Sequence, residues 1–231
     1  MASKDNLLLV NKPKGISSFD VIRILRKKLG AKKMGHAGTL DPLAEGLMLI
    51  GVGDEGTKTL SNYLKLPKTY IAEILIGERR TTADMEGQIV EEKNADALNC
   101  DEVKKVLEKM AGRINLPVPI FSAVKVKGEP LYKIARETLK KEGIAALDKL
   151  TQTAPQKEME VLVAKFISCR CRVSGDKKDR LLVKAEFEVS SGTYIRSLAE
   201  ELGARLGYPA ALFSLIRTKI GEFKLEEAII L

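Results

Sequence analysis

The sequence has few of the residues from which metal sites and hydrolytic sites are built. It contains one histidine, His36, and three cysteines, Cys100, Cys169 and Cys171. A zinc site would need nearly every soft ligand in the chain, so no metal is expected. There is no second histidine and no reactive-looking serine, so a hydrolytic triad is not expected either.

The small number of cysteines also bears on the cellular compartment. Cys169 and Cys171 alternate along an expected strand and would point to one face, where we expect them to be small buried hydrophobic residues. An odd number of cysteines without a signal peptide is typical of a reducing cytosol. We therefore expect a cytoplasmic protein.

Long apolar runs, internal repeats and low-complexity tracts are missing as well. No apolar stretch approaches the roughly 18 residues needed to cross a bilayer, so no membrane partner is expected. The length of 231 residues fits one domain, or one domain with a sizeable insertion.

Positively charged residues outnumber negatively charged ones. Lys and Arg together number 39 against 31 Asp and Glu, which gives a formal net charge of +8. This balance favours a polyanionic partner such as nucleic acid, although it also fits many soluble proteins and a basic protein that binds DNA or protein.

Local patterns predict both helices and strands. Apolar stripes between a cap and a stop glycine predict helices over 17–30, 99–112 and 194–207. β-branched and aromatic residues predict a strand over 68–76 and a hairpin over 161–190, whose second strand alternates apolar and charged residues. The sequence thus indicates a mixture of helix and sheet.

Residues 114–157 interrupt this rhythm. The segment opens with Pro117 and Pro119 and continues with a series of lysines and arginines. Phe121 and Tyr132 stand among these basic residues, and aromatic side chains among cations are typical of RNA-facing surfaces. We interpret the segment as a basic insertion, although its charges are also compatible with simple solvation.

A loop over residues 35–46 places one carboxylate, Asp41, between glycines and a proline. Glycine permits unusual backbone geometry, and Pro42 disfavours the helical conformation at Asp41. The loop shape is therefore specified by the sequence. Taken alone, the pattern fits an ordinary turn as well as a positioned catalytic carboxylate.

Four ordered motifs resolve this ambiguity by resemblance. They are Asn11–Gly15, Gly35–Pro42, Lys68–Tyr70 and Ser191–Arg196. Together they resemble the TruB family of tRNA pseudouridine synthases over roughly residues 6 to 228. The resemblance implies an α+β pseudouridine synthase fold, with a mixed, largely antiparallel sheet flanked by helices. It also implies isomerisation of uridine at position 55 in the T-arm loop of tRNA, without cofactor or metal.

The resemblance assigns the catalytic roles. Asp41 matches the family's catalytic aspartate, and Arg196 matches the arginine that pairs with it and keeps it ionised. Tyr70 matches the tyrosine that stacks on the flipped base.

It also assigns five substrate-binding residues. His36 matches the histidine that helps base flipping, and Leu215 matches the leucine that packs against the flipped uracil. Lys12 matches a supporting lysine near the active site, while Lys58 and Arg217 match residues expected near RNA phosphates.

Some positions depart from the family pattern. Phe121 stands where the family commonly has a tyrosine, and Ile216 replaces the first of two arginines. The chain stops at Leu231, where family members often continue into a PUA-type RNA-binding domain. We therefore expect residues 1–231 to form a single catalytic domain with a basic RNA-binding insertion at about 114–157 and no C-terminal PUA domain.

The expected partner is the T-arm stem-loop of tRNA, bound by a monomer. Two alternatives remain open from the residues. One is a pseudouridine synthase that acts on another RNA, and the other is a non-catalytic RNA-binding or RNA-folding module on the same scaffold.

Overall fold

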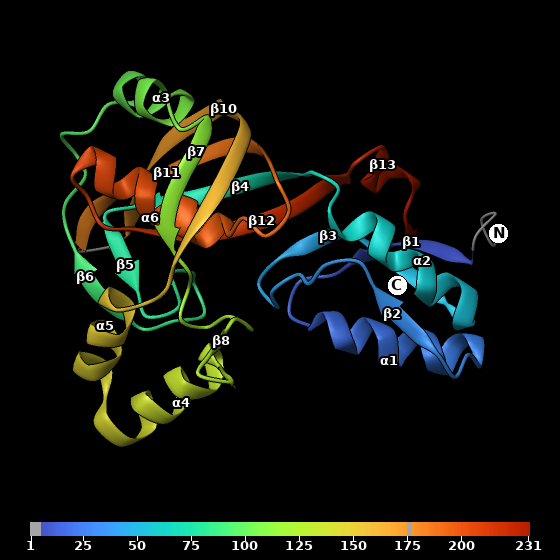
Figure 1. Ribbon diagram of the computed structural model, residues 1–231. Helices are drawn as coiled ribbons and strands as arrows, with labels where there is room; N and C mark the ends of the chain where they lie inside the picture. Colours follow the sequence, from blue (N-terminus) through green and yellow to red (C-terminus); the bar gives the residue numbers. More distant parts are fainter. Residues whose placement is uncertain (1–5, 175–176) are drawn as a thin grey trace. The chain divides into compact units, whose positions relative to one another are not determined.

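A computed structural model describes residues 6–174 and 177–231 (Figure 1). The chain divides into two compact units. The first unit comprises Met1–Ile71, Phe187–Ser191 and Leu215–Leu231, and the second comprises Ala72–Glu186 and Gly192–Ser214. Three strands, β4 (Lys68–Ile76), β11 (Lys177–Val189) and β12 (Ala210–Ile220), contribute residues to both units.

The first unit is built on a mixed sheet. Its order is β14-β1-β3-β12, with β2 beside β3 and β13 beside β12. Strand β3 pairs antiparallel with β1 and parallel with β12. The elements that lie wholly in this unit are β1 (Leu7–Lys12), α1 (Ser18–Leu29), β2 (Met34–His36), β3 (Glu45–Val52), α2 (Gly53–Leu64), β13 (Phe223–Lys224), the 3-10 helix η1 (Leu225–Glu227) and β14 (Ile229–Ile230).

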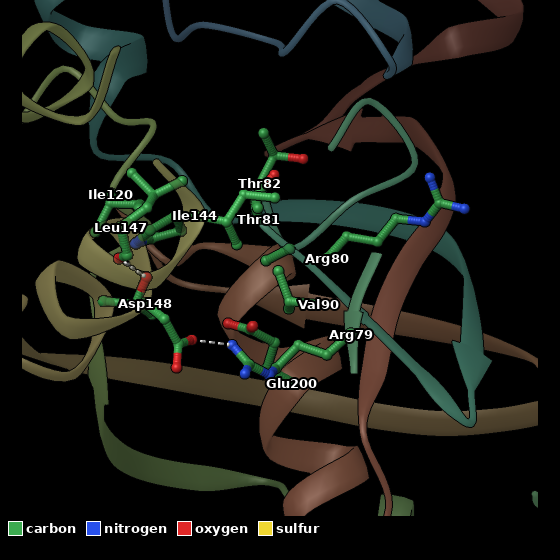
Figure 2. Close-up of a pocket in the computed structure, with 13 residues that line it drawn as sticks. Arg79, Arg80, Thr81, Thr82, Val90, Ile120, Ile144, Leu147, Asp148 and Glu200 are labelled. Carbon is green, nitrogen blue, oxygen red and sulfur yellow. Dashed lines mark hydrogen bonds and ion pairs between the residues drawn. The ribbon is translucent and has the colours of Figure 1, made fainter. Parts of the chain in front are cut away.

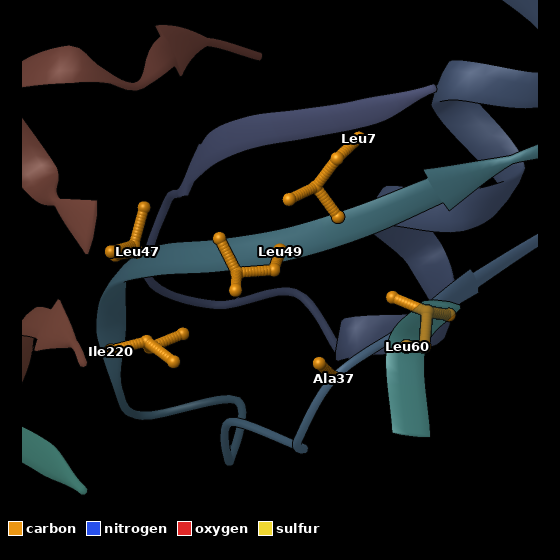
Figure 3. Packing of buried hydrophobic residues seen from close by; sticks show 6 residues of the cluster. All are labelled: Leu7, Ala37, Leu47, Leu49, Leu60 and Ile220. Carbon is orange, nitrogen blue, oxygen red and sulfur yellow. The ribbon is translucent and has the colours of Figure 1, made fainter. Parts of the chain in front are cut away.

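The core of the first unit brings the sheet together with α2 and the loop after β2. Figure 3 shows the buried cluster of Leu7, Ala37, Leu47, Leu49, Leu60 and Ile220. Full burial of one such leucine or isoleucine side chain contributes about 1.5–3 kcal/mol. Ala37 adjoins His36 in the chain, so this core also supports the start of the loop that carries Asp41.

Helix α1 has the boundaries that its sequence predicts. The Ser17 side chain accepts a hydrogen bond from the Asp20 main-chain N–H at 3.1 Å, and the Asp20 carboxylate accepts one from the Ser17 N–H at 2.8 Å. Gly30 ends the helix in the left-handed conformation, with φ of 64°.

Lys58 lies on helix α2. The helix begins at Gly53 despite two glycines in its first turns. Asp54 and Glu55 lie in the first turn, where their negative charges interact favourably with the helix dipole. Leu60 is buried in the unit's core. Packing therefore overrides the low helix propensity of glycine here.

The second unit contains a sheet with the order β12-β4-β11-β10-β7. Helix α3 packs against β10 and α6, and α6 also packs against β7. The elements wholly in this unit are β5 (Glu78–Arg80), β6 (Ile89–Glu92), α3 (Cys100–Glu108), β7 (Gly112–Pro117), β8 (Lys125–Val126), β9 (Glu129–Pro130), α4 (Leu131–Glu142), α5 (Ile144–Gln152), β10 (Gln156–Ser174) and α6 (Ile195–Leu206). The hairpin predicted over 161–190 includes residues 175–176, which lie outside the described part of the chain.

The segment between β7 and β10 forms a small lobe with its own core. Helices α4 and α5 pack together, as Figure 1 shows in yellow-green and yellow. Their shared buried cluster is Ile120, Leu131, Ala135, Leu147 and Ala154. This lobe lies within the basic insertion predicted over 114–157.

The prediction that Cys169 and Cys171 are small buried hydrophobic residues was wrong. Cys100, at the start of α3, and Cys169, on β10, form a disulfide, and Cys171 is free and exposed. The cause is the packing of α3 on β10, which joins two positions 69 residues apart in the sequence. The cysteines therefore no longer support a reducing compartment.

Two expected absences concern the described residues only. None of the helices there is both long and apolar enough to span a membrane. Within the same residues, no group of three or more histidine, cysteine, aspartate or glutamate side chains is placed to hold a metal ion.

Candidate active site

The loop that carries Asp41 connects β2 and β3 and is fixed on both sides of the carboxylate. The buried Ser18 hydroxyl donates to the Leu40 carbonyl oxygen at 3.0 Å and accepts from the Leu40 N–H at 2.8 Å. On the other side, the Gly15 N–H donates to the Pro42 carbonyl oxygen at 2.8 Å. Asp41 itself is half-buried. The loop is thus a defined support for a carboxylate, as its sequence predicts.

A third anchor of the loop comes from β12. Arg217 is 1% exposed. Its Nε donates to the Leu47 carbonyl oxygen at 2.7 Å, while its terminal nitrogens donate to the carbonyl oxygens of Thr39 at 3.4 Å and Gly38 at 3.2 Å. The buried Arg217 guanidinium therefore hydrogen-bonds main-chain groups at both ends of the loop.

Gly46 permits this arrangement. Its φ is +111°, and an added Cβ would lie 2.4 Å from the main-chain oxygen of Arg217. Only glycine tolerates both the backbone conformation and the close approach of β12 to β3.

His36 ends β2, five residues before the carboxylate, and is half-buried. Burial lowers the pKa of its imidazole, and the nearby Arg217 charge lowers this pKa further, against a backbone hydrogen bond to Gly38 that raises it. These effects favour the neutral form of the ring. Its Nδ1 atom is buried and lacks a hydrogen-bond partner among the described residues.

Tyr70 and Leu215 lie on β4 and β12, which are neighbouring strands, and both side chains are buried. The Thr218 hydroxyl donates to the Thr69 carbonyl oxygen at 3.3 Å, which links the two strands one residue before Tyr70. Their roles as walls around a uracil stay predictions.

Two of the predicted substrate-binding cations are in the interior: Lys12, expected to support the active site, and Arg217, expected near an RNA phosphate. Lys12 is fully buried, and its ammonium donates to the carbonyl oxygens of Pro13 at 3.0 Å and Ile16 at 2.8 Å. In this conformation neither side chain is open to an RNA phosphate. Arg217 instead hydrogen-bonds main-chain groups on either side of Asp41, whereas Lys12 hydrogen-bonds the segment from Pro13 to Ile16. Sequence reasoning could not anticipate this, because a buried cation and a surface cation look alike in the chain.

Lys58 differs from these two residues. It lies on the exposed face of α2, where its ammonium is 3.5 Å from the Glu55 carboxylate. An exposed pair of this kind contributes little to stability, so Lys58 is open to a phosphate.

Arg196 belongs to the second unit, in the first turn of α6, and is 5% exposed. Its terminal nitrogens donate to the carbonyl oxygens of Thr82 and Phe121, each at 3.1 Å, and its Nε lies 3.8 Å from the Asp84 carboxylate. The substituted residue Phe121 thus contributes through its main chain. The pairing of Arg196 with Asp41, which lies in the first unit, stays a prediction.

Asp84 is a residue that the sequence reasoning missed. It is 2% exposed and accepts hydrogen bonds from the Thr82 hydroxyl at 2.5 Å and the Glu86 N–H at 3.1 Å. These bonds hold its carboxylate beside Arg196. The only sequence signal is an aspartate in a polar turn, which is too common to single out.

A cavity of the second unit lies beside this arginine site. Figure 2 shows Arg79 of β5, Asp148 of α5 and Glu200 of α6 among its lining residues, with Arg79 and Asp148 paired at 2.7 Å. Glu200 follows Arg196 by one helical turn, and burial raises the pKa of its carboxyl to about 7. Thr82 also lines the cavity, so the carbonyl partner of Arg196 forms part of its wall.

Comparisons with known proteins identify the family of the chain. The family model described as "TruB family pseudouridylate synthase (N terminal domain)" matches residues 26–195. The tRNA pseudouridine synthase B of Aquifex aeolicus is 38% identical over 97% of this chain and 71% of its own length. The proteins of the same name from Protochlamydia amoebophila and Bacillus cereus (strain ATCC 14579) are 36% and 38% identical, over 97% of this chain and 78% and 69% of their own lengths.

Solved structures show the same fold. A chain from a Cbf5-Nop10-Gar1 complex matches with a TM-score of 0.67 at 24% identity, over 100% of this chain and 54% of that chain. A chain from an archaeal box H/ACA sRNP Nop10-Cbf5 complex matches with a TM-score of 0.62 at 22% identity, over 99% and 52%. The present chain therefore spans about half the length of these solved chains.

The predicted α+β pseudouridine synthase fold, with its mixed sheet and flanking helices, is confirmed by these matches and by the architecture. The family model covers well over half of the chain, and the bacterial relatives are matched over more than two thirds of their length. On both grounds, the chain belongs to the TruB family of pseudouridylate synthases.

Proposed function

We propose that the protein isomerises uridine to pseudouridine at position 55 in the T-arm loop of tRNA, with Asp41 as the catalytic carboxylate. The observation that carries the proposal is the Asp41 loop, which is held on both sides by Ser18, Gly15 and Arg217 in a chain of this family. The relatives named tRNA pseudouridine synthase B support tRNA as the substrate.

The reaction needs few groups. The bond from ribose C1′ to uracil N1 breaks, the base turns, and a new bond joins C1′ to C5. The hydrogen on C5 leaves as a proton and N1 gains one, so atoms balance without redox change, cofactor or metal. A carboxylate beside the reacting carbons acts as nucleophile or stabilises positive charge on the sugar, which is the role we give to Asp41.

The remaining residues serve this step. Arg196 keeps the Asp41 carboxylate ionised and oriented, because a guanidinium favours the charged form of an acid beside it. Tyr70 and Leu215 enclose the flipped base. A neutral His36 occupies the space that the base leaves, since an uncharged ring enters a base stack at lower desolvation cost than an imidazolium.

Substrate affinity would come mainly from exposed cations. Lys58 is exposed on α2 in the first unit. In the second unit, exposed lysines and an arginine follow β8 and α4: Lys125, Lys127, Lys133, Arg136, Lys140 and Lys141. These charges favour contact with the phosphates of the T-arm. We expect a monomer that acts in the cytoplasm, because its proposed substrate is tRNA and not because of its cysteines.

The test uses tRNA without modified nucleosides. Wild-type protein should create one carbodiimide-dependent reverse-transcription stop in the T-arm loop, and Asp41→Asn should bind the same tRNA without creating it. A stop in another RNA alone would replace the tRNA assignment, and equal activity in the variant would remove Asp41 from the mechanism.

A further inference from the structure

Arg217 is among the largest fully buried side chains in the described part of the protein. Its hydrogen bonds end on main-chain carbonyl oxygens of Gly38, Thr39 and Leu47. Among the described residues, no carboxylate forms an ion pair with it. Burying a cation without a countercharge is costly, so its retention calls for a specific reason.

The geometry supplies that reason. The three acceptors bracket the segment from Gly38 to Leu47, which contains Asp41. A guanidinium is planar and presents its donors in a fixed fork, so it holds several carbonyl groups at once, whereas a lysine ammonium is a single point on a flexible stem. Pairing of Arg217 with Gly46 across β12 and β3 fixes the start of this side chain as well.

We propose that Arg217 is a positioning residue, which holds the Asp41 loop in one conformation and sets a positive potential beneath it, and which does not contact RNA phosphate. The proposal rests on the proposed function in one respect, since it takes Asp41 as the catalytic carboxylate. The anchoring itself is a property of the protein without substrate.

The charge of Arg217 lowers the pKa values of two neighbouring groups. It is the second cause, after burial, of the lowered pKa of His36, and likewise of the lowered pKa of Lys68, which falls to about 8. Lys68 is otherwise held by the carbonyl oxygens of Leu64 at 2.6 Å and Leu66 at 2.7 Å. The potential of Arg217 therefore reaches the residue that ends β2 and the residue that begins β4.

The chain offers a direct probe of this potential, because His36 is its only histidine. Its ring protons give a single NMR titration that needs no assignment by mutation. We would compare Arg217→Gln, which removes the charge, with Arg217→Lys, which keeps the charge and loses the fork. Lys219→Gln, at an exposed position of the same strand, is the matched control.

In Arg217→Gln the pKa of His36 should rise toward its ordinary value of 6.5, and in Arg217→Lys it should stay near that of wild type. Both variants should lower the single-turnover rate on tRNA by about 10²-fold, because small displacements of a catalytic group have effects of this size. Their affinity for tRNA should change less than about twofold, and the salt dependence of binding should keep its slope. Lys219→Gln should leave the pKa of His36 and the turnover rate unchanged.

A loss confined to affinity, with a shallower salt slope and a normal single-turnover rate, would show that Arg217 is a phosphate contact and overturn the proposal. An unchanged pKa of His36 in a folded Arg217→Gln variant would show that Arg217 does not set the positive potential near the loop. If that variant does not fold, Arg217→Lys decides the positioning role, since a normal rate there contradicts it.

Failure of the proposed function gives a different result. Wild-type protein would then be inactive on tRNA, while the His36 titration and the hydrogen exchange of the Thr39 to Asp41 amides would still report whether Arg217 holds the loop. Faster exchange of these amides in both variants is expected, and unchanged exchange would contradict the anchoring.

Discussion

The two units hold their central charged residues in different ways. In the first unit the Asp41 loop is fixed by hydrogen bonds that end on main-chain groups, from Ser18, Gly15 and Arg217. In the second unit Arg196 is held by two carbonyl oxygens and by a carboxylate, Asp84. Main-chain groups do not titrate, so the first support should be indifferent to pH.

The second unit carries further groups that respond to conditions. It contains the Cys100–Cys169 disulfide, the partly buried carboxyl of Glu200 and the ion pair between Arg79 and Asp148. The comparison teaches that redox state and the titration of Glu200 should act through the second unit, while the hydrogen bonds that anchor the Asp41 loop end on main-chain groups that do not titrate. Four changes test this contrast.

Reduction of the disulfide should have the largest effect on stability. Cys100→Ser should lower the free energy of unfolding by about 4 kcal/mol under oxidising conditions, because the bond closes a loop with a sequence separation of 69. Urea denaturation with and without reductant measures this difference. Cys171→Ser is the control, since that cysteine is free and exposed, and it should have no effect. Three free thiols in the oxidised folded protein would contradict the pairing.

Asp84→Asn should have the next largest effect, on activity. Loss of its charge leaves the buried Arg196 without the carboxylate at its Nε, so the guanidinium can reorient. We expect the single-turnover rate to fall about 10- to 100-fold, or about 1.4–2.8 kcal/mol, with tRNA affinity nearly unchanged. Asp96→Asn, at an exposed position of the same unit, is the control. A normal rate in Asp84→Asn would show that carbonyl groups suffice for Arg196, as they do for Arg217.

Glu200→Gln should change how stability depends on pH. The pKa of Glu200 is raised from 4.5 to about 7, chiefly by burial, so the folded state binds its proton more tightly than the unfolded state. The unfolded state then binds fewer protons between pH 4.5 and 7, and this group's contribution to stability falls as pH rises through that window. Relative to wild type, the glutamine variant should gain about 3 kcal/mol at pH 8 and nothing at pH 4. Urea denaturation at several pH values measures the free energy of unfolding of both proteins. If this free energy depends on pH in the same way in wild type and in Glu200→Gln, the contrast between the units is wrong.

Ser18→Ala should have the smallest effect of the four. The change removes both hydrogen bonds to Leu40 but leaves the anchors at Gly15 and Arg217. We expect a loss of about 1 kcal/mol in stability and a severalfold lower rate that is independent of pH. Ser61→Ala serves as the matched control, because Ser61 is exposed on α2. A pH-dependent loss in Ser18→Ala would contradict a support made of groups that do not titrate.

Much of the local structure was predictable from the sequence. Ser17 and Gly30 mark the ends of α1, Gly207 ends α6, and the strand over Lys68–Ile76 has its predicted bounds. These features depend on short-range preferences of caps, glycines and β-branched residues, which single-sequence patterns record. The family and the fold followed from ordered motifs and are confirmed.

Long-range packing was not predictable in this way. The disulfide joins residues on α3 and β10, and the burial of Lys12 and Arg217 depends on the pairing of β1 and β12 with β3. Asp84 acquires its place beside Arg196 only when β5 and α6 have folded together. The prediction of a single domain stays a prediction. The chain divides into two compact units, and three strands contribute residues to both.

The central claim is that Asp41 drives transfer of the ribose from N1 to C5 of a uridine in the T-arm. When C5 forms its new bond, the hydrogen it carries must leave, so a T-arm stem-loop labelled with tritium at C5 of its uridines reports the reaction in water. Wild-type protein should release one tritium per substrate, and Asp41→Asn should slow the release by at least about 10³-fold while still binding the RNA. Release by the variant at the wild-type rate, or none from wild type, would contradict the account.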